Sequence, residues 1–265
     1  MRVKFYLIVL LAGLASCSSE KKKPVSIQSW ITTPDRTKQL TQRPDLVFGT
    51  EAGTGLTIEV DTSRTYQSID GFGFALTGGS AMLLKTKLTD EARAALLEEL
   101  FLTKENGIGI SYLRITIGSS DLDELIFTYN DLPPGETDTD LSKFTLAYDT
   151  LYLIPVLKEI LKLNPSLKIM GSPWSPPVWM KTNGFAKGGS LKKEYYNVYA
   201  DYFVHYIDAM ANHGIAIDAI TIQNEPENPN NTPSLVMAAE EQNEFIKNHL
   251  GPAFREAGIK TKIVL

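Results

Sequence analysis

An amide and a carboxyl group follow an apolar stretch in ITIQNEPEN, residues 220–228. Pro226 cannot donate to a strand ladder, so we expect a strand that ends at Glu225. A carboxyl group at a strand end can act as a general acid and then as a general base. Asn224 can donate its amide to a substrate hydroxyl group. Because Asn-Glu-Pro is short enough to occur by chance, its function must be judged with the rest of the chain.

Aromatic and polar residues follow two earlier apolar stretches. Arg114 and Asp121 belong to SYLRITIGSSD, and Trp174 and Trp179 belong to SPWSPPVWMKTNG. Indole rings pack against the apolar face of a sugar, while amides and carboxylates bind its hydroxyl groups. This set therefore predicts a carbohydrate site. The alternatives are that the tryptophans pack the interior and that Arg114 pairs with a structural carboxylate.

Retaining hydrolysis of a glycosidic bond uses two carboxyl groups about 5–5.5 Å apart, one as nucleophile and one as acid/base. Glu225 is our candidate for the acid/base. Its partner is missing from the pattern, because Glu227 and Glu240 follow Glu225 too closely to be trusted across a cleft. The chemistry needs only carboxylates and water, so no metal or organic cofactor is implied.

Strands and helices alternate along residues 67–265. We expect a first strand that ends near Gly73, further strands at 110–118, 167–175, 218–225 and 261–265, and helices at 89–101, 149–163, 194–214 and 233–258. This alternation predicts an α/β fold with a parallel sheet, either an open doubly wound sheet or a closed barrel. Both place function at the carboxyl ends of strands. We also expect Pro155 to kink its helix.

The N-terminal quarter of the chain has a different pattern. Residues 1–16 resemble the signal peptide of a bacterial lipoprotein, with Cys17 as the lipidation site and residues 17–24 as a polar linker. The alternative is an ordinary signal peptide with an incidental cysteine. We therefore expect an exported protein anchored by lipid to the outer membrane, in the periplasm or at the cell surface. Residues 25–66 alternate at 26–33 and 55–61, which predicts strands of a small β-domain.

The net charge of −5 and the pI near 5.3 argue against a nucleic acid partner, because phosphate binding favours a basic face. Carbohydrate or glycolipid is the partner that we expect.

Four segments in this order, DGFGFALTGGSA, SYLRITIGSSDL, GSPWSPPVWMKTNG and ITIQNEPEN, resemble glycoside hydrolase family 30, the glucosylceramidase-like family. The resemblance covers roughly residues 56–265. It implies a (β/α)8 TIM barrel with a side β-domain, and retaining hydrolysis of β-glucosides, glucosylceramide or β-glucan. By this resemblance Glu225 is the acid/base, Asn224 contacts the sugar 2-hydroxyl, Trp174 lines the pocket, Arg114 orders the catalytic carboxylates and Asp121 is a polar residue at the rim.

The sequence departs from the family in two places. Many members have an aspartate where this chain has Gly78, which leaves two alternatives, an exo-type pocket for glucosylceramide and a more open site for a glucan chain. The family nucleophile follows the seventh strand, whereas we expect residues 67–265 to form a barrel truncated after about five strands. We therefore expect no nucleophile in this chain and little hydrolysis by it alone. The alternatives are a surface lipoprotein that binds glycan without cleaving it and an inactive gene fragment.

Overall fold

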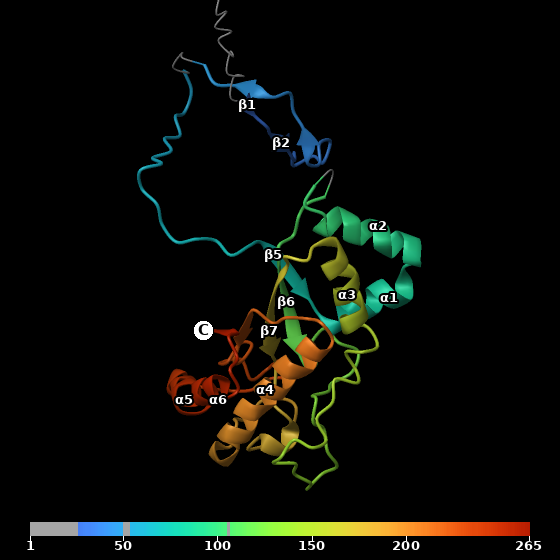
Figure 1. Ribbon diagram of the computed structural model, residues 1–265, viewed down its shortest axis with the longest axis vertical. Coiled ribbons are helices and arrows are strands. Elements are labelled where there is room, and N and C mark those ends of the chain that lie inside the picture. Colours follow the sequence, from blue (N-terminus) through green and yellow to red (C-terminus); the bar gives the residue numbers. More distant parts are fainter. Residues whose placement is uncertain (1–25, 50–53, 105–106) are drawn as a thin grey trace, which may run out of the picture. The chain divides into compact units, whose positions relative to one another are not determined.

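The computed structural model describes residues 26–49, 54–104 and 107–265 (Figure 1). The chain divides into two compact units, Met1–Tyr66 and Gln67–Leu265. The predicted signal peptide, the linker and Cys17 lie outside the described residues. In the part of the chain that is described, no helix is long and apolar enough to cross a membrane.

The first unit contains two short antiparallel strand pairs. Strand β1 (Ser26–Ile27) pairs with β4 (Leu46–Val47), and β2 (Trp30–Ile31) pairs with β3 (Thr41–Gln42). The strand predicted at 26–33 is therefore present as two short pieces.

The prediction of a strand at 55–61 was wrong. Residues 56–61 have no strand conformation, and the side chains of Leu56, Ile58 and Val60 are exposed. Alternation of apolar residues makes a strand only where a second strand supplies the hydrogen-bond partners, and no described residue pairs with this segment.

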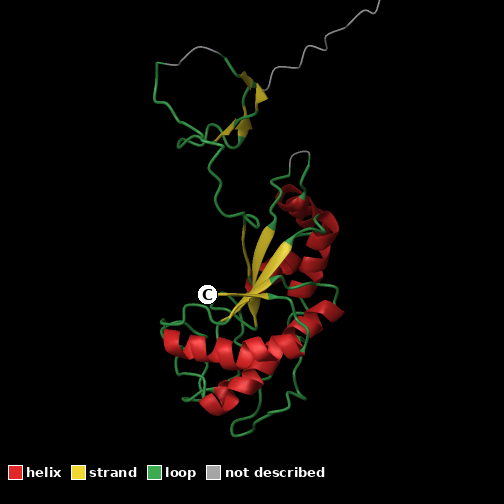
Figure 2. Ribbon diagram, turned by 60° about the vertical axis from the view of Figure 1, so that its left-hand side comes forward, coloured by secondary structure: helices red, strands yellow, loops and turns green. Residues whose placement is uncertain are grey.

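The second unit is built on a parallel sheet of five strands, drawn in yellow in Figure 2. The strands stand in chain order without a reversal: β5 (Gly73–Leu76), β6 (Tyr112–Ile117), β7 (Lys168–Pro173), β8 (Ala219–Thr221) and β9 (Lys262–Val264). A doubly wound sheet reverses its strand order at a switch point, whereas the strands of a (β/α)8 barrel follow one another. The sheet therefore confirms the predicted barrel-type α/β fold.

Helices connect these strands. They are α1 (Gly78–Lys87), α2 (Asp90–Phe101), α3 (Leu153–Leu163), α4 (Tyr196–Asn212), α5 (Ala239–Phe245) and α6 (Gly251–Glu256), with a π-helical turn at Ile246–Leu250 and 3₁₀ turns at Val178–Met180 and Lys193–Tyr195. The helices predicted at 89–101, 149–163 and 194–214 are confirmed within a few residues at their ends.

Four details differ from the sequence-based expectations. The first strand begins at Gly73 instead of ending there, and the unpredicted α1 follows it. The last predicted helix begins at Ala239, six residues late, because 233–238 run as a loop. Strand β8 ends at Thr221 instead of Glu225. Pro155 is the third residue of α3, where the backbone N–H has no partner within the helix, so it does not interrupt the hydrogen-bond ladder.

The hydrophobic core lies between one face of the sheet and the helices. On β6, the side chains of Leu113, Ile115 and Ile117 are buried in this core. Successive residues of a strand point to opposite faces, so Arg114 and Thr116 belong to the other face. This alternation separates the packed side of the sheet from the side that carries polar groups.

Candidate active site

Three neighbouring strands bring the predicted polar residues together. Arg114 lies on β6, Trp174 follows β7, and Asn224 and Glu225 follow β8. The Arg114 guanidinium donates through Nη2 to Asn224 Oδ1 across 2.7 Å. The carboxyl ends of the parallel strands thus meet where the sequence predicted a site.

A row of hydroxyl groups supports Arg114 across the sheet. The strand register places Arg114 beside Met170 and Thr116 beside Ser172. Ser172 therefore lies on the same face of the sheet as Arg114, two residues further along the strand direction. Arg114 Nη2 donates to Ser172 Oγ across 2.9 Å, and Ser172 Oγ lies 2.6 Å from Thr221 Oγ1 on β8. Burial lowers the pKa of Arg114 and the Glu225 carboxylate opposes this change, so the guanidinium keeps its charge.

The indole of Trp174 lies between a cation and a carboxylate. Arg114 stands over the ring with its central carbon 4.9 Å from the ring centroid. Trp174 Nε1 donates to Asp121 Oδ1 across 3.1 Å. The residue is only 6% exposed, yet it does not belong to the hydrophobic core. Asp121, Trp174 and Arg114 therefore form one connected group at the strand ends.

The segment after β8 stays attached to β7. The backbone N–H of Asn224 donates to the carbonyl of Pro173 across 2.7 Å. Gln223 Nε2 donates to the carbonyl of Trp174, also across 2.7 Å. These bonds hold residues 223 and 224 beside the end of β7, although β8 itself has already ended. The position of Asn224 is consequently set by its backbone as well as by Arg114.

Glu225 has an uncommon backbone conformation and a defined side-chain environment. Its φ angle is +46°, in the left-handed region that residues other than glycine seldom adopt. The side chain is exposed, and its Oε2 accepts hydrogen bonds from Asn228 Nδ2 at 2.9 Å and Asn231 Nδ2 at 2.8 Å. Such strain is typical of functional positions that the surrounding structure holds in place. Within the described residues, both hydrogen bonds to this carboxylate reach Oε2.

A buried lysine holds the loop that carries these asparagines. Lys181 is 1% exposed and donates to Ser175 Oγ at 2.9 Å, to the Ala186 carbonyl at 2.8 Å and to the Ser234 carbonyl at 2.6 Å. Ser234 Oγ in turn donates to the carbonyl of Asn231 across 2.6 Å. Burial lowers the pKa of Lys181 to about 7. Lys181 therefore connects the loop after β7 to the loop that positions Glu225.

Trp179 is the predicted site residue that lies outside this group. Its Nε1 donates to the carbonyl of Asn130 at 3.1 Å and to Asn130 Oδ1 at 3.0 Å. Its ring meets Tyr195 edge-on with 5.0 Å between centroids, and it belongs to the hydrophobic core. This position fits the packing alternative, because the hydrogen bonds and the ring contact of Trp179 join it to Asn130 and Tyr195.

Gly78 lies against a carboxylate that the sequence did not single out. A Cβ atom at position 78 would come within 2.3 Å of Asp123 Oδ1, closer than real Cβ atoms approach. Asp123 Oδ2 accepts hydrogen bonds from the backbone N–H and the hydroxyl of Ser120. The absence of a side chain at Gly78 thus lets Asp123 approach the start of α1.

Several residues that complete the site were missed at the sequence level: Ser172, Thr221, Lys181, Asn228, Asn231 and Asp123. For Asn228 and Asn231 the sequence contained a signal, because they follow Glu225 at intervals of three residues. The lysine stood inside the segment SPPVWMKTNG. The hydroxyl row had no signal, because strand register decides which residues become neighbours.

Comparisons with known proteins show the family of the chain. The model of the glycosyl hydrolase family 30 TIM-barrel domain matches residues 69–265. An endo-1,6-beta-D-glucanase of Neurospora crassa is 40% identical over 221 residues, which cover 81% of this chain and 45% of that protein. The lysosomal acid glucosylceramidase of Mus musculus is 34% identical over 224 residues, which cover 80% of this chain and 42% of that protein.

A solved structure gives the same result at the level of the fold. The structure of an endo-beta1,6-glucanase superposes with a TM-score of 0.79 and 38% sequence identity, covering 88% of this chain and 50% of that one. The chain spans about half the length of the curated relatives it matches. Because the family model matches well over half of the chain, the chain belongs to glycosyl hydrolase family 30.

Proposed function

We propose that the protein is a retaining β-glycosidase of β-glucan, with Glu225 as acid/base. The observation that carries the proposal is the connected group of Arg114, Asn224 and Trp174 beside Glu225 at the carboxyl end of the sheet. The names of the relatives include glucanases at 36–40% identity and glucosylceramidases at 30–34% identity. We therefore place β-1,6-glucan before glucosylceramide as the substrate.

The proposed acid/base role uses the two oxygens of Glu225 differently. Asn228 and Asn231 both donate to Oε2, which leaves Oε1 to carry the proton. Glu225 gives this proton to the departing glycosidic oxygen while a second carboxylate attacks the anomeric carbon. Glu225 then takes a proton from the water that releases the sugar. We assign the second carboxylate to no residue of this chain.

Asn224 and Trp174 are proposed to bind the sugar. Because Arg114 donates to Asn224 Oδ1, the amide group of Asn224 is oriented with its NH₂ available to a substrate hydroxyl. Trp174, fixed by Asp121 and Arg114, supplies an aromatic wall.

Lipidation of Cys17 would keep the enzyme at a membrane surface after export. Mass spectrometry of the purified protein, compared with Cys17→Ser, tests this anchor.

The first experiment measures the release of reducing sugar from β-1,6-glucan by the protein as it is produced from its gene. Glu225→Gln should lower turnover by about 10²–10⁴-fold. Glu227→Gln is the matched control, because Glu227 is also exposed and lies two residues away. Full activity of Glu225→Gln overturns the proposal. Binding of glucan by the unchanged protein without any release favours the glycan-binding lipoprotein instead.

A further inference from the structure

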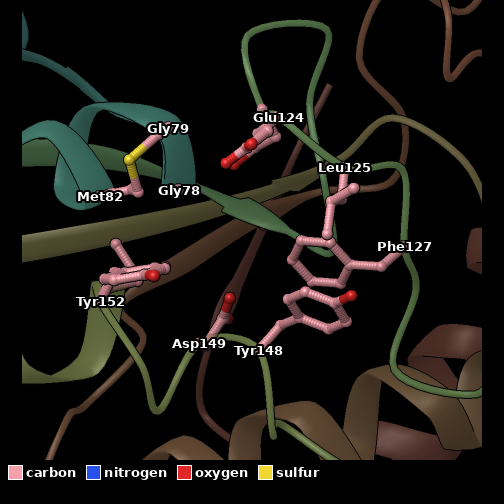
Figure 3. A pocket seen from close by; sticks show the side chains of 11 residues that line it. Gly78, Gly79, Met82, Glu124, Leu125, Phe127, Tyr148, Asp149 and Tyr152 are labelled. Carbon is pink, nitrogen blue, oxygen red and sulfur yellow. The ribbon is translucent and has the colours of Figure 1, made fainter.

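The hollow beside the start of α1 is too small for a ligand of the size of a sugar. Phe127 and Tyr148 lie on one side of it, and Met82 and Tyr152 lie on the other (Figure 3). It encloses about 60 Å³, whereas ligand pockets typically enclose about 300–1,000 Å³. Polar contacts that the proposed mechanism does not yet use lie instead around Ser234, in the loop after β8.

This loop carries the two asparagines that donate to Glu225. Residues 222–238 connect β8 to α5 and contain no helix or strand. The backbone N–H of Met237 donates to the Pro226 carbonyl across 2.8 Å, and the Met237 side chain is buried in the core. The two ends of the loop are therefore anchored. The stretch 228–231 between them needs further contacts to keep its place, because it has no ladder of backbone hydrogen bonds.

Ser234 supplies these contacts with its hydroxyl group. The residue is buried, and its Oγ donates to the Asn231 carbonyl across 2.6 Å. The Pro229 carbonyl oxygen lies 3.2 Å from the same Oγ. Among the described residues, no other donor reaches the carbonyl groups of residues 229–231. The hydroxyl of Ser234 therefore ties the main chain at Asn231 to the interior.

The loop after β7 fixes Ser234 in turn. The Gly188 N–H donates to Ser234 Oγ across 2.9 Å, so the single hydroxyl proton is directed to the carbonyls on the other side. The Ser234 N–H donates to the Ala186 carbonyl across 3.0 Å, and Lys181 Nζ donates to the Ser234 carbonyl. Every polar atom of Ser234 is thus bonded to residues 181–188, and its hydroxyl proton extends this support to Asn231.

These contacts form one path to Glu225. The path runs from Gly188 through the Ser234 hydroxyl to the main chain of Asn231, whose amide donates to Glu225 Oε2 across 2.8 Å. We propose that Ser234 is a positioning residue for the acid/base step, which holds the Asn231 amide on Glu225 without itself bonding to Glu225. The inference rests on the proposed function and extends it, because the loop after β7 then contributes to the orientation of the acid.

Heteronuclear NMR of the isotope-labelled full protein tests this contact without requiring turnover. The side-chain amide signal of Asn231, identified by its loss in Asn231→Ala, should shift in Glu225→Ala, because the carboxylate that accepts its hydrogen bond is gone. Ser234→Ala should shift the same signal in the same direction. An Asn231 signal that Ser234→Ala leaves in place overturns the inference.

Ser190→Ala is the matched control for the NMR measurement. Ser190 belongs to the loop after β7, and its hydroxyl makes no hydrogen bond among the described residues. Ser190→Ala should therefore leave the Asn231 signal unchanged. Thermal melting shows whether each variant is folded. Ser234→Cys fills more of the same space with a weaker donor, and it replaces Ser234→Ala in all measurements if Ser234→Ala melts below the assay temperature.

A kinetic double-mutant cycle tests the consequence for the reaction. Ser234→Ala should lower kcat on β-1,6-glucan by about 3–10-fold with little change in KM, the size expected for one lost hydrogen bond that acts on the barrier. In the Asn231→Ala background it should lower kcat no further, because the path is already broken. A merely structural role would lower kcat by the same factor in both backgrounds, and this result overturns the inference while the proposed function stands.

Failure of the proposed function gives a different result. If the unchanged protein hydrolyses no glucan, the proposed function is overturned, and the NMR signal of Asn231 then decides by itself whether Ser234 holds that amide on Glu225.

Discussion

Arg114 and Asn224 are 110 residues apart in the sequence, and the guanidinium of the first donates to the amide oxygen of the second across 2.7 Å. The bond joins β6 to the segment after β8 across the intervening β7. It turns the amide oxygen of Asn224 towards Arg114. It also holds a positive charge near Glu225. We therefore expect Arg114 to act as a positioning residue, and its effect on activity can be measured.

Arg114→Lys should lower kcat by about 10–100-fold with a smaller change in KM. An ammonium group is a point charge and cannot bond Ser172 and Asn224 while also stacking on Trp174. Steady-state kinetics on β-1,6-glucan measure the effect. Arg255→Lys, an exposed change on α6, is the control. A rise in KM with unchanged kcat would show that Arg114 contributes only to substrate binding.

Asn231→Ala should reduce activity on glucan more than activity on aryl glucosides with good leaving groups. The variant removes one of the two donors to Glu225 Oε2 and so disturbs the proposed acid that protonates the leaving oxygen. A good leaving group needs little protonation. Asn230→Ala is the control, since the side chain of Asn230 makes no hydrogen bond among the described residues. Equal losses on both kinds of substrate would contradict a role in positioning the acid.

Lys181→Met should destabilise the fold by roughly 2–5 kcal/mol. The substitution leaves the Ser234 carbonyl without the Lys181 donor and removes one of the two donors to the Ala186 carbonyl, and the loss of a buried hydrogen bond costs about 1–3 kcal/mol. Chemical denaturation measures the change in the free energy of unfolding. Lys187→Met, in the same loop but exposed, should change it by less than about 0.5 kcal/mol. Equal effects of the two substitutions would show that the three hydrogen bonds of Lys181 contribute nothing.

Asp149→Asn should flatten the dependence of stability on pH between about 4 and 7. Burial raises the pKa of Asp149 to about 7, with a further upward effect of Asp123 and an opposing one of the Tyr129 hydroxyl. In the unfolded chain the carboxyl group titrates near 3.8, so across this range the folded state binds more protons. Asp149 therefore contributes stability at low pH that is lost as the pH rises towards 7.

Thermal melting of both proteins at several pH values measures this effect. The contribution of Asp149 should fall with rising pH by a few kcal/mol, at about 1.4 kcal/mol per unit of pKa shift. Asp208→Asn, a change at an exposed position on α4, should leave the profile of the unchanged protein intact. If Asp149→Asn keeps the same pH profile, Asp149 is not the group responsible.

The local pattern predicted the elements with strong periodicity. Residues 90–101 form α2, which begins after the Thr89 cap and carries two acidic residues in its first turn, as the sequence indicated. The stretch at 112–117 forms β6, in which the side chains of Leu113, Ile115 and Ile117 alternate along the strand and are buried in the core. The prediction of a strand failed where the segment has no neighbouring strand to pair with. Leu56, Ile58 and Val60 alternate like a strand, yet no described strand pairs with them.

For the site, the sequence by itself determined the residue types and their places at strand ends: Arg114, Trp174, Asn224 and Glu225 were all found from strand endings and motif order. Tertiary structure decided which residues meet. Strand register aligned Ser172 with Thr221 under Arg114, and packing turned Trp179 into the core. The physical reason is that a hydrogen bond such as Arg114–Asn224 depends on distances of a few tenths of an ångström between strands, which no local pattern of residues encodes.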